Sequence, residues 1–272
     1  MHLEGINILV DGYNLELQKG TGIKSYGINL IKALISLDIN VDVLCSRNLS
    51  NINNSILDAA LFFDSQTNNI GKKSQIKAVM SAAIQLFSKA HKIPYSDFVI
   101  KQEFDSIFDL LNTQNEAGEI FNQVNCYKMA NILYRKVNLT TKVNIDKKID
   151  IFHATYPLPI KINRAKKITT IHDIIPLKLP YTTLDDKSFF FKTIKNTIKD
   201  SDLILTVSEN SKKDILDCFD VDTDKIFVTH QAIVNNSFPI LEHDIFKTLN
   251  KFKLKYKKYI LFVGAIEPKK NI

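Results

Sequence analysis

The chain has 272 residues, of which 45% are hydrophobic and 24% charged, so it can bury a core in one large or two modest domains. It has no apolar run of the roughly eighteen residues that a transmembrane helix needs, and its N-terminus lacks the basic flank and cleavage site of a signal peptide. Three scattered cysteines, Cys45, Cys126 and Cys218, form no CxxC pair, which argues against a disulfide framework or a cysteine zinc site. We therefore expect a soluble cytoplasmic protein.

The net charge of +7 is compatible with nucleic acid, an anionic membrane surface or phosphorylated ligands as partners. The basic residues are spread out, and no zinc-finger spacing, RNP-type aromatic motif or basic helix-turn-helix is present. A basic nucleic-acid-binding protein is therefore the least favoured class, and we expect no nucleic-acid partner.

The chain begins with a pattern of strand, glycine-rich loop and helix. Residues 6–10 form a short apolar run, and five of the eight glycines lie within the first 27 residues. Residues 23–37 carry apolar side chains at three- and four-residue spacing, which predicts a helix, and residues 41–45 predict a second strand. This opening is typical of an α/β domain that handles a nucleotide or a sugar.

Residues 46–149 are the least informative part of the sequence. Residues 76–90 show the apolar spacing of an amphipathic helix, and a second helix is expected within residues 120–137. The section is longer than a minimal crossover requires. Either it is an insertion that shapes a binding cleft, or its helices pack on the core.

Strands and helices alternate again in the second half of the chain. We expect strands at residues 149–153, 168–172, 203–207 and 226–228, and helices at residues 185–199 and 209–219, the last capped by Ser208. This alternation predicts the α/β class with a Rossmann-like, doubly wound, mostly parallel sheet. Residues 241–258 resemble a lysine-rich, partly helical connector, and residues 259–263 predict a further strand that ends at Gly264.

Two histidines follow apolar strands. His172 and Asp173 end the run at residues 168–172 and are followed by Pro176, and His153 ends an earlier strand. The carboxyl ends of strands are where open α/β sheets bind ligands, and a histidine there can exchange a proton near neutral pH or bond a sugar hydroxyl. The alternative for each is a histidine satisfied by neighbouring protein groups.

Four stretches of the sequence, taken together and in order, closely resemble the family 4 glycosyltransferases, which are retaining enzymes of GT-B fold. The stretches are residues 20–23 (GTGI), 170–176 (TIHDIIP), 205–214 (LTVSENSKKD) and 262–271 (FVGAIEPKKN). The resemblance implies two Rossmann-like domains, the first mainly binding the acceptor and the second the nucleotide-sugar donor. It implies an acceptor domain over residues 1–240, a linker over 241–258, and the start of a truncated donor domain over 259–272. The family's paired donor-site glutamates would then lie beyond the last residue.

The resemblance also assigns roles to residues of the first loop and of the strand end. Gly22, with Gly20 and Thr21 before it, matches the loop where the backbone approaches the donor phosphates and the acceptor. His172 matches the histidine near the transferred sugar, and Asp173 would orient that histidine or its loop. The alternative for Gly22 is a helix-entry glycine without a ligand.

The last stretch matches the beginning of the donor site. Gly264 ends the expected strand, and Lys270 matches the lysine that neutralises the donor pyrophosphate. Many relatives carry an arginine where Ala265 stands here, and Lys269 can substitute for it in part, without the bidentate fork. The alternative for the two lysines is a solvated charge pair.

The implied function is transfer of a sugar of mannose type, with retention, from a nucleoside-diphosphate sugar to a cell-surface glycan or lipid-linked acceptor. The resemblance implies no metal or other cofactor and no activity of this fragment alone. The basic charge of the chain predicts a peripheral contact with anionic membrane. A non-catalytic module that binds a glycan or a partner subunit is the alternative. A dinucleotide-binding turn is disfavoured, because the third glycine of GxGxxG falls at Ser25.

Overall fold

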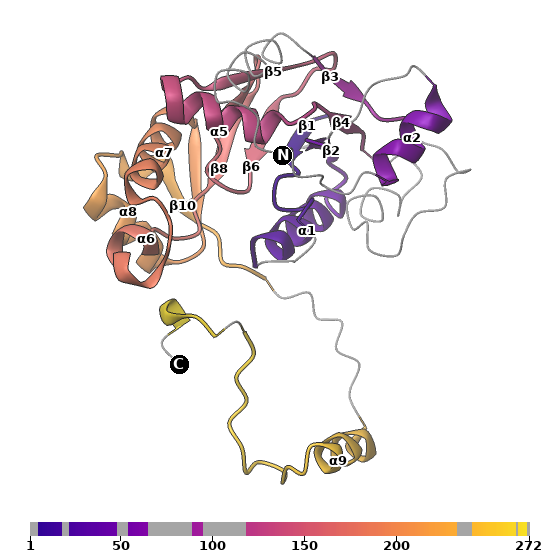
Figure 1. The fold of residues 1–272 in the computed structure, drawn as a ribbon, viewed down its shortest axis with the longest axis vertical. Helices are drawn as coiled ribbons and strands as arrows, with labels where there is room; N and C mark the ends of the chain where they lie inside the picture. Colours follow the sequence, from indigo (N-terminus) through magenta and orange to yellow (C-terminus); the bar gives the residue numbers. More distant parts are fainter. Residues whose placement is uncertain are drawn as a thin grey trace. The chain divides into compact units, whose positions relative to one another are not determined.

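The computed structural model describes residues 5–17, 22–47, 54–64, 89–94, 118–232, 241–264 and 266–270. The chain forms two compact units, the first made of residues 1–174 and 186–231 and the second of residues 175–185 and 232–272 (Figure 1). The second unit thus takes up a short segment from the middle of the chain. The predicted division into residues 1–240, 241–258 and 259–272 stays a prediction.

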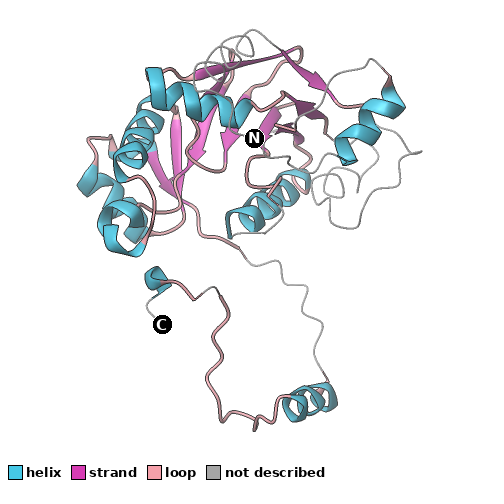
Figure 2. Ribbon diagram, viewed as in Figure 1, coloured by secondary structure: helices cyan, strands magenta, loops and turns pink. Residues whose placement is uncertain are grey.

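The first unit is built on one mostly parallel sheet (Figure 2). In chain order its described strands are β1 (Asn7–Asp11), β2 (Asn40–Cys45), β3 (Lys89–Lys92), β4 (Ile120–Asn122), β5 (Thr141–Ile145), β6 (Ile151–Ala154), β7 (Ile160–Ile162), β8 (Lys166–Thr170), β9 (Leu203–Thr206) and β10 (Ile226–Val228). Their spatial order is β10-β9-β8-β6-β1-β2-β4-β3-β5-β7, and β3 runs antiparallel to β4. The predicted mostly parallel α/β sheet is confirmed.

Both units contain described helices. The first unit contains α1 (Gly22–Ile35), α2 (Ser55–Asp64), α5 (Cys126–Val137), α7 (Lys187–Asp200), α8 (Glu209–Cys218) and the short 3₁₀ turn η2 (Thr223–Lys225). The second contains α6 (Ile175–Lys178), α9 (Glu242–Lys251) and the 3₁₀ turns η1 (Pro180–Thr182) and η3 (Pro268–Lys270).

Alternate residues of the central strands build two separate cores, as period-2 side-chain alternation requires. Ile8 and Val10 of β1 pack in one buried cluster with Ile31 of α1. Leu9, between them in the sequence, packs in another cluster with Tyr127 of α5. Helices therefore cover both faces of the sheet, which is the meaning of a doubly wound fold.

Side-chain caps fix the first turns of two helices. Ser208 accepts a hydrogen bond from the Ser211 N–H at 3.1 Å, and Asp186 accepts one from the Phe189 N–H at 3.0 Å. Such caps satisfy N–H groups that have no partner inside the helix. The predicted start of α8 after Ser208 is confirmed, and α7 begins two residues later than predicted.

A helix was expected within residues 120–137, and α5 confirms it. Residues 120–122 before it form β4 beside β2, and the helix begins after Asn125, which has left-handed backbone angles. One predicted element is corrected. Residues 259–263 form no strand: Ile260 is fully exposed, and no described strand pairs with this run. A strand needs a neighbour for its backbone groups, and apolar residues alone do not supply one. Most of the helix predicted at residues 76–90 lies outside the described residues.

A buried carboxyl group joins the carboxyl ends of β1 and β6. Asp11 is fully buried and accepts hydrogen bonds from the backbone N–H groups of Tyr13, at 3.1 Å, and Thr155. Burial raises its pKa to about 6, although the bonds from Thr155 and Tyr13 and the nearby charge of Lys167 act to lower it. The adjoining Gly12 is required by packing, since a Cβ there would lie 2.6 Å from the Leu44 carbonyl oxygen.

Asp11→Asn should change how stability depends on pH. The folded-state pKa of Asp11 lies above its ordinary value of 3.8, so proton binding favours the fold at low pH, and this contribution is lost as pH rises through about 6. The asparagine does not titrate. The wild-type free energy of unfolding should therefore fall, relative to the variant, by about 3 kcal/mol between pH 4 and pH 7.

Urea unfolding at a series of pH values measures this difference. Asp38→Asn, at an exposed aspartate whose left-handed backbone suits asparagine, is the matched control and should show no comparable trend. Parallel pH profiles for wild type and Asp11→Asn would contradict the assignment.

Candidate functional site

The candidate site lies where three neighbouring parallel strands end. β8, β6 and β1 are adjacent in the sheet, so the residues after Thr170, after Ala154 and around Asp11 meet at one edge. His172 follows the end of β8 by two residues. The structure thus places the predicted histidine at the edge where α/β sheets bind ligands.

Three hydrogen bonds hold His172. Its Nε2 lies 3.0 Å from the Thr155 carbonyl oxygen, and its Nδ1 lies 3.2 Å from the side-chain nitrogen of Gln231. The hydroxyl of Ser211 donates to the His172 carbonyl oxygen at 2.9 Å. Because a carbonyl oxygen only accepts, Nε2 carries the proton, and Nδ1 accepts from the Gln231 amide.

His172 is neutral near pH 7. Burial lowers its pKa below the ordinary 6.5, while the bond to Thr155 and the charge of Asp173 act in the opposite direction. A neutral ring whose Nε2–H is bound to the backbone presents one acceptor atom, Nδ1. The site therefore offers a positioned hydrogen-bond acceptor rather than a fixed positive charge.

Tyr26, which contacts the ring of His172, also belongs to a hydrogen-bonded group with Thr170 and His153. The Tyr26 hydroxyl and His153 Nε2 each lie 2.9 Å from the Thr170 hydroxyl. The ring of Tyr26 meets that of His172 edge-on, with centroids 4.9 Å apart and an interplanar angle of 89°. Such an edge contact restricts the orientation of the imidazole.

His153 lies beneath this site and is 4% exposed. Burial, with a smaller effect from His172, lowers the pKa of His153 to about 4, so it is neutral near pH 7. It reaches the site only through Thr170. A direct ligand contact by His153 stays a prediction.

Asp173 lies next to His172 in the sequence, is exposed, and contributes a charge that acts on the His172 ring. Its role in orienting the histidine stays a prediction.

The first loop is described only at its end. Gly22 is the first residue of α1 and is exposed, and a Cβ there would meet no atom within 4 Å. Packing of the described residues therefore does not require glycine at this position, and the expected approach of a ligand stays a prediction. Gly20 and Thr21 lie outside the described residues.

The predicted donor-site residues belong to the second unit. Gly264 has a φ of +156°, and Lys270 is an exposed residue of η3 whose N–H donates to the Glu267 carbonyl oxygen at 2.9 Å. The side chain of Lys269 lies outside the described residues. The structure therefore brings His172 and His153 together but does not relate them to Lys270.

Sequence reasoning missed three residues of the site, namely Tyr26, Ser211 and Gln231. In the sequence, Tyr26 is only one of the positions whose spacing predicts a helix. Ser211 lies in the stretch of residues 205–214, at the start of a predicted helix, but it received no role in the site. Gln231 follows β10 without any motif of its own. Only the fold brings these residues to His172.

In the described part of the chain, no group of three or more His, Cys, Asp or Glu side chains is placed to hold a metal ion. No described helix is long and apolar enough to cross a membrane.

Comparison with known proteins adds an independent observation. Residues 120–234 match the family model described as Glycosyltransferase Family 4. O-antigen chain mannosyltransferase B of Escherichia coli is 33% identical over 92 residues, which are 34% of this chain and 24% of that protein. The chain thus aligns with much less than two thirds of this relative. The family match contains His153, His172, Ser211 and Gln231, and over these residues the chain is similar to glycosyltransferase family 4.

Proposed function

We propose that the protein transfers a sugar, of mannose type, from a nucleoside-diphosphate sugar to a growing cell-surface glycan or lipid-linked acceptor, with retention. The observation that carries this proposal is His172, held at the carboxyl ends of β8 and β6 within the family match. The mannose donor is suggested by the printed name of the Escherichia coli relative. The acceptor class is suggested by the same name, which refers to an O-antigen chain.

In this proposal His172 positions a hydroxyl group and does not attack the sugar. Its Nε2–H is bound to the Thr155 carbonyl, so the hydroxyl donates to Nδ1 after displacing the Gln231 amide. No protein nucleophile is invoked. The acceptor oxygen bonds to the anomeric carbon of the donor sugar while the bond from that carbon to the donor phosphate breaks on the same face, and the departing phosphate takes the acceptor proton. Asp173 keeps the loop in place.

The remaining parts of the proposal concern the donor and the cellular location. Gly20, Thr21 and Gly22 would approach the donor phosphates through backbone N–H groups at the start of α1. Gly264, Lys269 and Lys270 would contribute to binding the diphosphate, whose charge lysine can neutralise. We place the protein in the cytoplasm, in peripheral contact with an anionic membrane, acting without a metal cofactor.

His172→Ala should abolish most of the sugar transfer, because it removes Nδ1, the hydrogen-bond acceptor that positions the hydroxyl group in this proposal. We expect a fall of roughly 100-fold or more in kcat/KM. The measurement is transfer and donor hydrolysis over a panel of nucleotide sugars. It uses the protein encoded by the complete reading frame, together with a glycolipid extract as acceptor.

His243→Ala is the matched control, because His243 is an exposed histidine of α9 and should leave the rate unchanged. Turnover of one donor that survives in His172→Ala would refute the assigned role. A folded protein that turns over no donor would favour the non-catalytic binding module.

Gln231→Ala should raise the pKa of His172. The Gln231 amide donates to Nδ1 and so stabilises the neutral ring, and its removal makes protonation easier. Gln231→Glu should raise the pKa further, because it places a negative charge beside the imidazole. NMR titration of the His172 ring protons in the wild type and in each variant measures both shifts. Unchanged His172 titration in both variants would contradict the hydrogen bond.

A further inference from the structure

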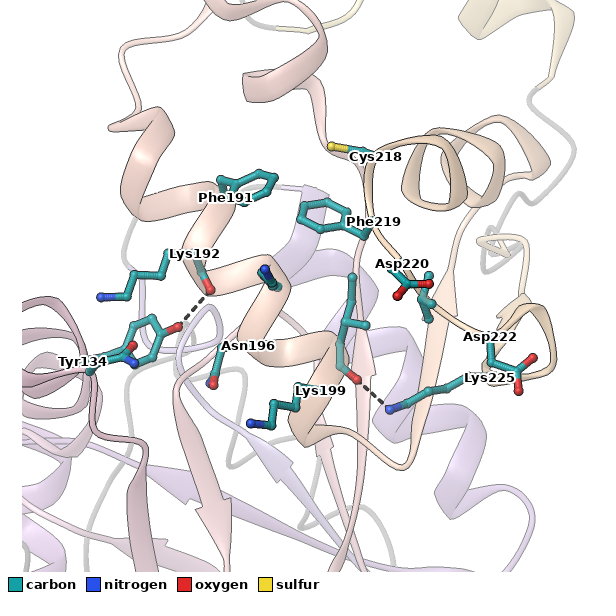
Figure 3. A pocket seen from close by; sticks show the side chains of 14 residues that line it. Tyr134, Phe191, Lys192, Asn196, Lys199, Cys218, Phe219, Asp220, Asp222 and Lys225 are labelled. Carbon is teal, nitrogen blue, oxygen red and sulfur yellow. Dashed lines mark hydrogen bonds between the residues drawn. The ribbon is translucent and has the colours of Figure 1, made fainter.

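A pocket of about 710 Å³ lies in the first unit between α5, α7 and the connection from α8 to β10 (Figure 3). Its lining includes Lys199, near the end of α7 and shortly before β9, and Lys225, the residue before β10. It is thus associated with the amino ends of these strands, whereas His172 follows the carboxyl end of β8. The candidate site described above does not account for this pocket.

One wall of the pocket is positively charged. Lys192, Lys195 and Lys199 line it from α7, spaced so that they share one side of the helix. All three are exposed, and Lys195 and Lys199 bind no carboxylate among the described residues. Placing like charges along one helix face costs free energy that an anion would offset.

The other charged residues of the lining make hydrogen bonds within the protein or lie away from the lysines of α7. Lys225 donates to the Ile198 carbonyl oxygen at 2.6 Å at the end of α7. Asp222 accepts the N–H of Asp224 at 3.0 Å. In Figure 3 the carboxylates of Asp220 and Asp222 lie on the side of Lys225, away from the ammonium groups of Lys192 and Lys199. The α7 wall therefore keeps its positive charge.

An aromatic pair forms a second recognition element. Phe191 of α7 and Phe219 at the end of α8 stack with ring centroids 5.0 Å apart and an interplanar angle of 27°. Phe219 is 7% exposed, but Phe191 is 40% exposed, so part of the outer ring lies open to the pocket. An exposed aromatic ring beside these lysines can stack on a flat ring whose attached anionic group reaches the ammonium groups.

We propose that this pocket binds a small soluble ligand that carries a phosphate group on a flat ring. Lys195 and Lys199 bind the phosphate as point charges, and Phe191 stacks on the ring. The volume is within the range of sites for small molecules. This proposal does not rest on the proposed sugar transfer, because none of these residues belongs to the site around His172.

Phenyl phosphate is the probe, and its binding to the whole chain is followed by NMR titration. Lys195→Glu/Lys199→Glu should weaken binding at least about tenfold, because it replaces two attractive charges by repulsive ones. The control Lys32→Glu/Lys128→Glu makes the same change in net charge at exposed helical lysines outside the pocket, and it should change the affinity less than about twofold.

Phe191→Ala tests the aromatic part separately. It should weaken the binding of phenyl phosphate but leave the weaker binding of inorganic phosphate unchanged, because only the former loses a stacking partner. Equal effects on both ions would overturn the ring-stacking assignment. Circular dichroism establishes that each variant is folded.

Three further outcomes would overturn the proposal. The first is that the wild type shows no saturable binding of phenyl phosphate. The second is that both double variants weaken this binding equally, which would mean that only the overall charge attracts the ion. The third is binding to vesicles of phosphatidylcholine and phosphatidylglycerol without binding to phenyl phosphate, which would identify a membrane surface. His172→Ala should bind phenyl phosphate like the wild type, and a weakened affinity there would locate the ion at the strand ends instead.

Discussion

The site depends on the backbone of one residue, Thr155, just beyond β6. Its N–H donates to the buried carboxyl group of Asp11, and its carbonyl accepts the Nε2–H of His172. One rigid residue thus connects the ends of β1, β6 and the loop after β8. Because Asp11 is fully buried, its hydrogen bonds cannot be replaced by water without reorganising the strand ends. The position of the imidazole is therefore set by the central sheet rather than by its own loop.

The central sheet was readable from the sequence because most of its strands contain apolar runs, as is typical of parallel strands buried on both faces. The exception is β8, which has the polar sequence KKITT and was found from the apolar residues that overlap and follow it. β1, β2, β6, β8, β9 and β10 all fall at or within two residues of the predicted runs. The missed strands are short or polar: β3 has the sequence KAHK and β5 the sequence TKVNI. Such segments become strands only because a neighbouring strand completes their hydrogen bonds.

The candidate site was predictable in part for a related reason. His172 follows a readable strand, so its place at the carboxyl edge could be inferred from the sequence alone. Its contacts could not be inferred, because Tyr26 and Gln231 are 146 and 59 residues away from His172 in the chain. Residues 259–263 illustrate the opposite error, since a local strand pattern was present there without any described partner strand.

Gln231 has a second property besides its bond to His172. It is the last residue of the first unit, and the chain passes into the second unit at Ala232. A ligand that takes Nδ1 of His172 must release the side chain of this boundary residue. Binding at the strand-end site and the hydrogen bond of Gln231 to His172 are therefore linked equilibria, and each influences the other by the same free energy.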